Sequence, residues 1–212
     1  MPALNNIKNI IFDLGNVIID LDFPATFQCF SELSGLSPHE VKDRTQGLMF
    51  FVEYEKGLIS SQVFREQVRE LLGLSVEDHQ IDRAWNSMLG GIPAERLQLL
   101  KDLQPHFRTF ALSNTNEIHV QEFNNIIARS TGSVQSFMDH FEKVYYSCHM
   151  KMRKPEAQIY QKVLHEQNLR PQETLFIDDN LSNIESASSL GVRTVHLTNP
   201  GDLISLFNGA IG

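Results

Sequence analysis

The sequence predicts an α/β fold in which a doubly wound parallel sheet carries an inserted group of helices. Two observations lead to this prediction. Short apolar runs alternate with amphipathic helical segments through residues 92–212, and such alternation is typical of a parallel sheet. In addition, the segment between Asp13 and Ser113 is much longer than the single crossover helix that two parallel strands need. We therefore expect an insertion between the first strand and the second.

The elements of the predicted sheet follow in order along the chain. The run Ile10-Ile11-Phe12 predicts the first strand, and Gly15-Asn16 marks a turn directly behind it. Gly191 is well placed to end a helix. After the insertion, the hydrophobic pattern predicts helices at 94–103, 118–128, 157–168 and 183–190, and strands at 107–112, 143–147, 175–177 and 193–197.

The inserted segment shows the pattern of several amphipathic helices. Ser37-Pro38-His39-Glu40 and Ser75-Val76-Glu77-Asp78 are typical of helix starts with acidic first turns. Phe50, Phe51 and Trp85 could line a substrate pocket, but aromatic side chains in a small helical domain usually belong to its core. We expect the helices at 25–33, 38–45, 50–54, 60–72 and 76–88.

Composition and charge narrow the function classes. The chain has 212 residues, 42% of them hydrophobic, and a formal net charge of −8, which argues against binding to nucleic acid or to an anionic membrane. Its two cysteines, Cys29 and Cys148, are far apart and follow no motif, so we expect reduced thiols and a cytoplasmic protein. Residues 1–8 lack the pattern of a signal peptide, and no apolar run approaches membrane-spanning length. The eight histidines show no metal-ligand spacing.

Carboxylates follow two of the predicted strands directly. Asp13 ends the first strand, where open α/β sheets place their ligands. Asp178 and Asp179 end the strand at 175–177. Two adjacent carboxylates repel each other unless a cation or a proton lies between them, so a hard divalent metal is a natural occupant.

Two further motifs provide groups that suit a phosphate. Ser113-Asn114 follows the strand at 107–112 with hydroxyl and amide groups. Lys154-Pro155 precedes the predicted helix at 157–168, and Pro155 fits the first position of that helix. Lys154 would then lie at the helix start, where the helix dipole favours anions rather than cations. A bound anion is the better reason for a lysine at that place.

Taken together, these motifs resemble those of the haloacid dehalogenase superfamily of phosphatases, and the resemblance covers nearly the whole chain. The phrases Phe-Asp-Leu-Gly-Asn-Val, Leu-Ser-Asn-Thr-Asn, Met-Arg-Lys-Pro-Glu and Asp-Asp-Asn look similar to the branch that acts on sugar phosphates such as α-glucose 1-phosphate. The resemblance implies a Rossmann-like core, residues 1–19 and 92–212, and a helical cap domain, residues 20–91. It also implies a small phosphorylated metabolite as substrate, and it carries no prediction of oligomeric state.

The resemblance also implies a role for each motif residue. Asp13 would be the nucleophile that forms an aspartyl phosphate, and Ser113 and the backbone at Asn114 would bind the phosphoryl group. Lys154 would neutralise its charge. Lys151 and Arg153 compete with Lys154 on composition alone, and the family pattern of Lys followed by Pro decides for Lys154. The predicted cofactor is Mg²⁺, held by Asp13, the carbonyl of Gly15 and Asp179, with Asp178 binding it directly or through an intervening group and Asn183 orienting the site.

Gly15 departs from the family pattern. The usual first motif is Asp-x-Asp, whose second carboxylate protonates the leaving oxygen, and Gly15 occupies that position here. Such general acid–base help is typically worth about 10² to 10⁴ in rate. Gly15 could instead serve the backbone, through a positive φ or a close approach to an anion. Two alternatives to the phosphatase therefore stay open: a hydrolase of carbon–halogen bonds, and a catalytically weakened protein that binds a phosphometabolite.

Overall fold

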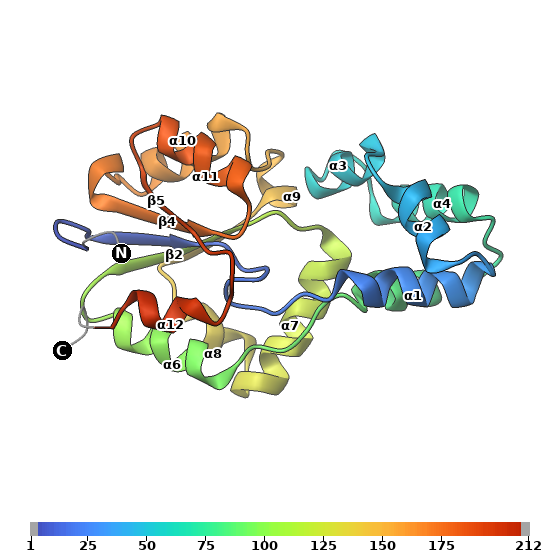
Figure 1. Ribbon diagram of the computed structural model, residues 1–212, viewed down its shortest axis with the longest axis horizontal. Helices are drawn as coiled ribbons and strands as arrows, with labels where there is room; N and C mark the ends of the chain where they lie inside the picture. The colour runs from blue at the N-terminus through green and yellow to red at the C-terminus, as the bar shows by residue number, and fades with distance from the viewer. Residues whose placement is uncertain (1–3, 209–212) are drawn as a thin grey trace.

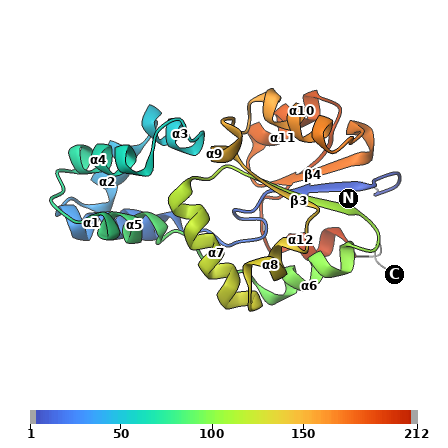
Figure 2. The same ribbon diagram turned by 180° about the vertical axis from the view of Figure 1, so that it is seen from behind.

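The computed structural model describes residues 4–208, so the ends of the predicted core, 1–3 and 209–212, lie outside the described residues (Figures 1 and 2). Within this range the strands form one parallel sheet in the order β3-β2-β1-β4-β5. The prediction of a doubly wound parallel sheet is confirmed. Their bounds are β1 Asn9–Phe12, β2 Arg108–Ser113, β3 Lys143–Tyr146, β4 Thr174–Asp178 and β5 Arg193–His196.

The register of the central strands brings the sequence motifs to one edge of the sheet. Phe12 of β1 pairs with Ala111 of β2 on one side and with Ile177 of β4 on the other. Because all three strands run in the same direction, the residues that follow them meet at the carboxyl edge. This edge faces the separate group of helices to the right in Figure 1.

Helices cover both faces of the sheet, and alternate strand residues pack against each layer. Phe12 is fully buried against one layer, whereas Ile11 and Phe176 are buried against the other. Each such side chain contributes about 1.5 to 3 kcal/mol when it is fully removed from water. One face carries α6 (Ala94–Leu103), α7 (Glu117–Thr131), α8 (Val134–Met138) and α12 (Asp202–Leu206); the other carries α10 (Ala157–Glu166) and α11 (Leu181–Ser189), and α9 (Ser147–Met150) follows β3 (Figure 1).

The inserted helices, which we call the cap, have a hydrophobic core of their own. Fully or almost fully buried side chains such as Phe64, Val68 and Ile81 form its centre. Ser37 begins one helix with a capping box to Glu40, as expected. The cap consists of α1 (Phe23–Ser34), α2 (Pro38–Thr45), α3 (Met49–Glu55), α4 (Ser61–Leu72) and α5 (Asp78–Asn86).

Two neighbouring crossings connect the cap to the core. The amide of Gly90 donates to the carbonyl of Asp20 over 2.8 Å, and the amide of Asp20 donates to the carbonyl of Gly91 over 3.1 Å. Leu21 and Leu89 form an antiparallel bridge beside them. We keep 1–19 with 92–212 as the core and 20–91 as the cap as our proposal for the domain boundaries.

Two details of the sequence-based prediction are wrong. Helix α10 begins at Ala157 with Glu156 as its N-cap, so Pro155 precedes the helix and Lys154 does not lie at its start. A turn intervenes, in which the amide of Glu156 donates to the carbonyl of Arg153. Helix α5 begins later than predicted, because Glu77 and Gln80, rather than Ser75, form its capping box. The short helices α8, α9 and α12 were not predicted, since four or five residues show no helical period.

Candidate active site

A cavity of about 340 Å³ lies between the carboxyl edge of the sheet and the cap. We call it the active-site cavity. Of the predicted site residues, all but Asp178 line it directly; Asp178 is fully buried at the end of β4. The lining includes Asp13, Gly15, Asn16, Ser113, Asn114, Lys154, Asp179 and Asn183 from the core, and Glu55, Trp85 and Met88 from the cap.

Lys154 is the electrostatic centre of this arrangement. Its ammonium nitrogen lies 2.9 Å from Oδ1 of Asp13 and 2.7 Å from Oδ2 of Asp178, and its side chain is 1% exposed. Burial alone would lower the pKa of Lys154, but the charges of the two carboxylates more than offset this effect and raise it. The lysine therefore stays charged inside the protein, where it can face an anion.

Asp13 keeps one oxygen available toward the cavity. Its Oδ1 accepts hydrogen bonds from the amide of Leu14, at 2.7 Å, and from Lys154. None of the hydrogen bonds found for the described residues ends at its other oxygen, Oδ2. Burial raises the pKa of Asp13 to about 7, with Asp178 and Asp179 adding to the rise and Lys154 opposing it. A carboxylate so placed gains from any further positive charge beside it.

The three aspartates form a cluster that fits a divalent metal. One carboxylate oxygen from each of Asp13, Asp178 and Asp179 lies within 4.8 Å of the others. Three like charges this close are costly, and oxygen ligands with that spacing are what Mg²⁺ and Ca²⁺ take. The donor set therefore fits the predicted Mg²⁺.

The two acids at the end of β4 differ in how they are held. Asp178 accepts hydrogen bonds at both oxygens, from Lys154, from the Asn183 amide group and from the amide of Asn180. Asp179 lines the cavity and accepts from the Asn16 amide group over 3.0 Å. Asp178 thus has most of its acceptor capacity filled by protein groups, whereas Asp179 has capacity left for a cation.

Asn114 fixes the backbone beside the lysine. Its side chain donates to the carbonyl of Lys154 and accepts from the amide of Lys154, both over 2.9 Å. Ser113, the last residue of β2, is buried at the same edge. The competing cations have other partners: Lys151 donates to the carbonyl of Gly57, and Arg153, which also lines the cavity, pairs with Glu55 over 2.9 Å. This pattern explains why Lys154, and neither of its neighbours, meets Asp13.

The turn after Asp13 differs from one expectation. Asn16 has a positive φ of 53°, whereas Gly15 does not adopt this conformation. A Cβ at Gly15 would lie 2.7 Å from Cδ1 of Leu21, so the absence of a side chain there makes room for the leucine. Gly15 therefore serves a close packing contact rather than a left-handed turn.

Sequence reasoning missed several groups that line the cavity. Glu55 comes from the end of α3 and Thr115 and His119 from the segment after β2. The imidazole of His119 stacks on Trp85 with ring centroids 4.9 Å apart, and burial lowers the pKa of His119 to about 4. Thr115 and His119 follow β2 at the carboxyl edge of the sheet, so the core itself places them at the cavity. Glu55 reaches the site only because the cap docks on the core.

One further cluster lies outside the cavity. Glu117, Cys148 and His149 each offer a ligand atom within 4.8 Å of the others. Burial raises the pKa of the Cys148 thiol to about 12, so a metal ligated there would first have to displace a tightly held proton. Both cysteines are free, as expected. Among the described residues, no helix is both long and apolar enough to span a membrane.

Comparisons with known proteins agree with the geometry. The family model for haloacid dehalogenase-like hydrolases matches residues 7–191. The D-ribitol-5-phosphate phosphatase of Bacteroides thetaiotaomicron is 30% identical over 197 residues, covering 92% of this chain and 94% of its own. A HAD family enzyme of the same organism, solved with magnesium and inorganic phosphate, is 39% identical with a TM-score of 0.80, covering 89% of this chain and 93% of that one.

A more distant structure shares the fold alone. The L-2-haloacid dehalogenase of Xanthobacter autotrophicus is 20% identical with a TM-score of 0.60, covering 89% of this chain and 76% of that one. The closer relatives confirm the predicted enzyme class, a phosphoric monoester hydrolase, and the predicted cofactor, Mg²⁺. The chain belongs to the family of haloacid dehalogenase-like hydrolases.

Proposed function

We propose that this protein is a magnesium-dependent phosphatase of small phosphorylated metabolites, with sugar or polyol phosphates as substrates, which acts through an aspartyl phosphate on Asp13. The arrangement around Lys154 carries the proposal. A buried ammonium group lies between Asp13 and Asp178 beside a cavity that Asp13 and Lys154 both line. In that position a lysine neutralises a phosphate dianion next to the attacking carboxylate.

The reaction takes place in two transfers, which splits one difficult step into two easier ones. A carboxylate oxygen of Asp13 attacks phosphorus, the bond from phosphorus to the ester oxygen breaks, and that oxygen leaves with the electron pair and takes up a proton. Water then attacks the phosphorus of the aspartyl phosphate. The bond to Asp13 breaks, inorganic phosphate leaves, and the carboxylate is restored.

Other residues hold the phosphoryl group during both transfers. Ser113 and the backbone at Asn114 bind its oxygens, and Lys154 neutralises their charge. A magnesium ion held by Asp13, the Gly15 carbonyl and Asp179 would supply further neutralisation at the same oxygens. Asp178 positions Lys154 by accepting a hydrogen bond from its ammonium group. Asn183 in turn fixes Asp178 by donating to both of its carboxylate oxygens.

Glu55 takes the proton-transfer role that Gly15 cannot fill. Its carboxyl group lines the active-site cavity from the cap and pairs with Arg153. Burial raises the pKa of Glu55 above its ordinary value, although Arg153 and Lys154 oppose the rise. In this role Glu55 passes a proton to the leaving oxygen, and its carboxylate then accepts the proton of the attacking water.

A similar protein supports a hydroxylated substrate. It is a D-ribitol-5-phosphate phosphatase, so its name gives a polyol phosphate as its substrate. Thr115 and Arg153 line the active-site cavity of the present protein beside Asp13 and Lys154, and they add polar side chains to its walls.

Turnover by the purified protein tests the proposal. Release of inorganic phosphate from p-nitrophenyl phosphate and from a panel of polyol and sugar phosphates is measured with magnesium and with excess chelator. We expect magnesium-dependent release that is highest for members of the panel with several hydroxyl groups. Chloride release from 2-chloropropionate without phosphatase activity would instead favour the dehalogenase alternative. Tight binding of a sugar phosphate without turnover would favour the regulatory one.

A further inference from the structure

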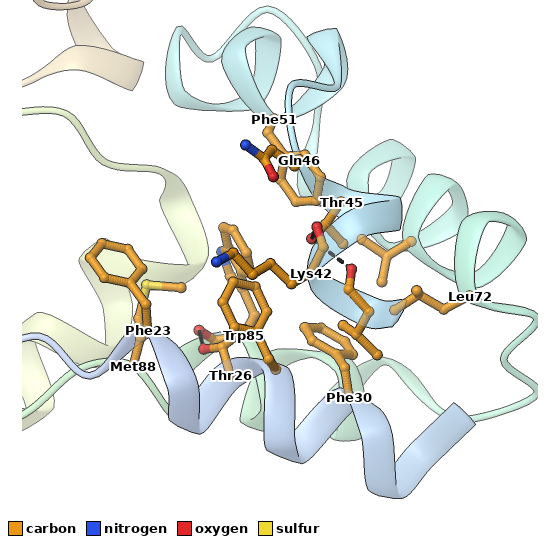
Figure 3. Close-up of a pocket in the computed structure, with 13 residues that line it drawn as sticks. Phe23, Thr26, Phe30, Lys42, Thr45, Gln46, Phe51, Leu72, Trp85 and Met88 are labelled. Atoms are coloured by element: carbon orange, nitrogen blue, oxygen red, sulfur yellow. Dashed lines mark hydrogen bonds between the residues drawn. The ribbon is translucent and has the colours of Figure 1, made fainter. Parts of the chain in front are cut away.

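A second cavity, of about 250 Å³, lies inside the cap (Figure 3). We call it the cap pocket. Side chains from all five cap helices line it, and most are aromatic or aliphatic, including Phe27, Phe30, Phe51 and Leu72. An apolar cavity of about 150 Å³ already holds a benzene molecule in another protein. The cap pocket is therefore large enough for an aromatic ring.

The cap pocket adjoins the active-site cavity. Phe23, Trp85 and Met88 line both cavities, and Figure 3 shows Phe23 and Met88 together at the side of the cap pocket that faces the core. The indole of Trp85 is fixed from the core side, because its Nε1 donates to Oδ1 of Asn116 over 3.4 Å and its ring stacks on His119. The two cavities thus share one wall, which a molecule anchored at Asp13 must pass to enter the cap.

The hydroxyl groups of the cap pocket already have partners in the protein. Oγ1 of Thr26 lies 3.4 Å from the carbonyl of Trp85 and 3.3 Å from Oγ of Ser87, and Oγ1 of Thr45 donates to the carbonyl of Val41 over 2.8 Å. The remaining polar side chains of its lining, Lys42 and Gln46, are exposed to solvent. Apart from Lys42 and Gln46, the lining thus offers little to a sugar hydroxyl or to a water molecule.

We propose that the cap pocket binds an apolar group, an aromatic ring or a hydrocarbon of similar size, at the far end of a phosphate monoester whose phosphate lies at Asp13. This inference rests on the proposed phosphatase function and adds a second substrate class, phosphate monoesters with an apolar far end, beside the sugar and polyol phosphates. The aromatic walls favour a ring, because ring pairs attract each other beyond their simple burial. Burial of one phenyl group raises affinity by about 10-fold to 100-fold.

Binding of ω-phenylalkyl phosphonates tests the inference without turnover. These analogues carry a phenyl ring at the end of one to six methylene groups, and methylphosphonate is the reference without a ring. The chain has a single tryptophan, Trp85, so its fluorescence reports on the wall shared by the two cavities. With magnesium present, we expect affinity at least 10-fold above that of methylphosphonate, with an optimum at one linker length. Equal affinity along the whole series would overturn the inference.

Matched variants on one helix assign the effect to the cap pocket. Val68 lines the pocket from α4 and is buried, whereas Val63 is 38% exposed on the same helix and does not line it. We expect Val68→Phe to reduce the affinity ratio of phenylalkyl phosphonate to methylphosphonate toward one, and Val63→Phe to retain the ratio. Thr45→Phe, at a half-buried position of the lining, repeats the test if Val68→Phe does not fold. An unchanged ratio in a folded Val68→Phe or Thr45→Phe protein would contradict the inference.

The same titrations separate this inference from the proposed function. If no phosphate monoester is hydrolysed but affinity follows linker length and the ratio falls in Val68→Phe, the cap pocket stands and the phosphatase proposal fails. If sugar phosphates are hydrolysed and affinity ignores the ring, the phosphatase proposal stands and the cap pocket inference fails.

Discussion

The ammonium nitrogen of Lys154 lies 2.7 Å from Oδ2 of Asp178, and the two side chains are 1% and 0% exposed. An ion pair this deeply buried contributes little net stability, because desolvation consumes most of its attraction. Its value lies in position: Asp178 holds the lysine where the same nitrogen also reaches Asp13, at 2.9 Å. Of the two acids at the end of β4, Asp178 therefore holds the lysine, and we expect Asp179 to bind the cation.

We expect Asp178→Ala and Asp179→Ala to separate stability from metal binding. Asp178→Ala removes one buried partner of Lys154 and should lower the free energy of unfolding by about 3 kcal/mol or more. Asp179 is half-exposed, so Asp179→Ala should change the free energy of unfolding little. It should weaken magnesium binding more than Asp178→Ala does. Urea unfolding and calorimetric titration with Mg²⁺ measure the two effects. Equal losses of metal affinity in both variants would contradict the prediction, because Asp178 and Asp179 would then contribute equally to metal binding.

Lys154→Met should cost catalysis rather than metal affinity. The methionine has similar length but no charge, so a bound phosphoryl group loses its buried countercharge. We expect kcat to fall by about 10² to 10³ and inhibition by inorganic phosphate to weaken. Mg²⁺ affinity should change little. Lys162→Met, at a half-exposed position of α10 outside the active-site cavity, is the control. Normal kcat in Lys154→Met would remove the lysine from the mechanism.

Asp13→Asn should abolish turnover while the fold is kept. The amide is nearly isosteric with the carboxylate but is a poor nucleophile, so we expect residual activity at the detection limit. In the unaltered protein, beryllofluoride with Mg²⁺ should attach at Asp13, and mass spectrometry or crystallography locates it. Asp102→Asn, an exposed carboxylate of α6, should retain full activity. A phosphoryl mimic found on another residue would contradict the assigned nucleophile.

Glu55→Gln should make the rate depend more steeply on the leaving group. Phosphates of alcohols need a proton on the departing oxygen, whereas aryl phosphates with low leaving-group pKa do not. We therefore expect kcat/KM to fall by about 10² or more for alcohol phosphates and far less for p-nitrophenyl phosphate. A plot of log kcat/KM against leaving-group pKa for both proteins measures the change.

Two further variants control this test. Glu53→Gln lies on the same helix, α3, outside the lining of the active-site cavity, and should leave the slope unchanged. Gly15→Asp combined with Leu21→Ala should restore part of the lost rate in Glu55→Gln, because the smaller side chain removes the contact at 2.7 Å. If Glu55→Gln leaves the slope unaltered, another group supplies the proton.

The fold should lose stability in acid through His119. Its pKa is about 4 in the folded protein, against the ordinary 6.5, because burial disfavours the charged ring. Above pH 6.5 the ring is neutral in both states, and between pH 6.5 and 4 only the unfolded chain takes up the proton. This uptake favours unfolding by about 3 kcal/mol across the window. Urea midpoints of His119→Gln should depend less on pH there than those of the natural protein or of exposed His165→Gln.

The sequence predicts those site residues that lie at the ends of buried strands. Asp13, Ser113 and Asp178 end buried strands, so the parallel sheet alone brings them to one edge. The sequence predicts Lys154 as a phosphate ligand at a helix terminus, and that placement is wrong. Lys154 lies in a turn, where the Asn114 side chain binds its backbone amide and carbonyl.

The contributions of the cap could not be predicted in the same way. Glu55 reaches the cavity because α3 docks on the core, where Ser147 donates to its carbonyl over 2.6 Å. Trp85 was expected in the core of the cap, yet it lines both cavities because His119 and Asn116 hold its ring. These contacts join residues far apart in the sequence, and no local pattern encodes them.

Because the two crossings at Asp20 and Gly90 lie side by side, the whole cap can be replaced without changing the core. Its two ends leave the core side by side, and a Cβ at Gly90 would lie 2.7 Å from the carbonyl oxygen of Asp20, so only glycine permits this spacing. Replacing everything between the crossings changes the walls around the leaving group without lengthening, shortening or redirecting the strands that present Asp13 and Ser113. The choice of substrate, and with Glu55 the choice of proton donor, can therefore diverge while the core strands keep Asp13 and Ser113 in place.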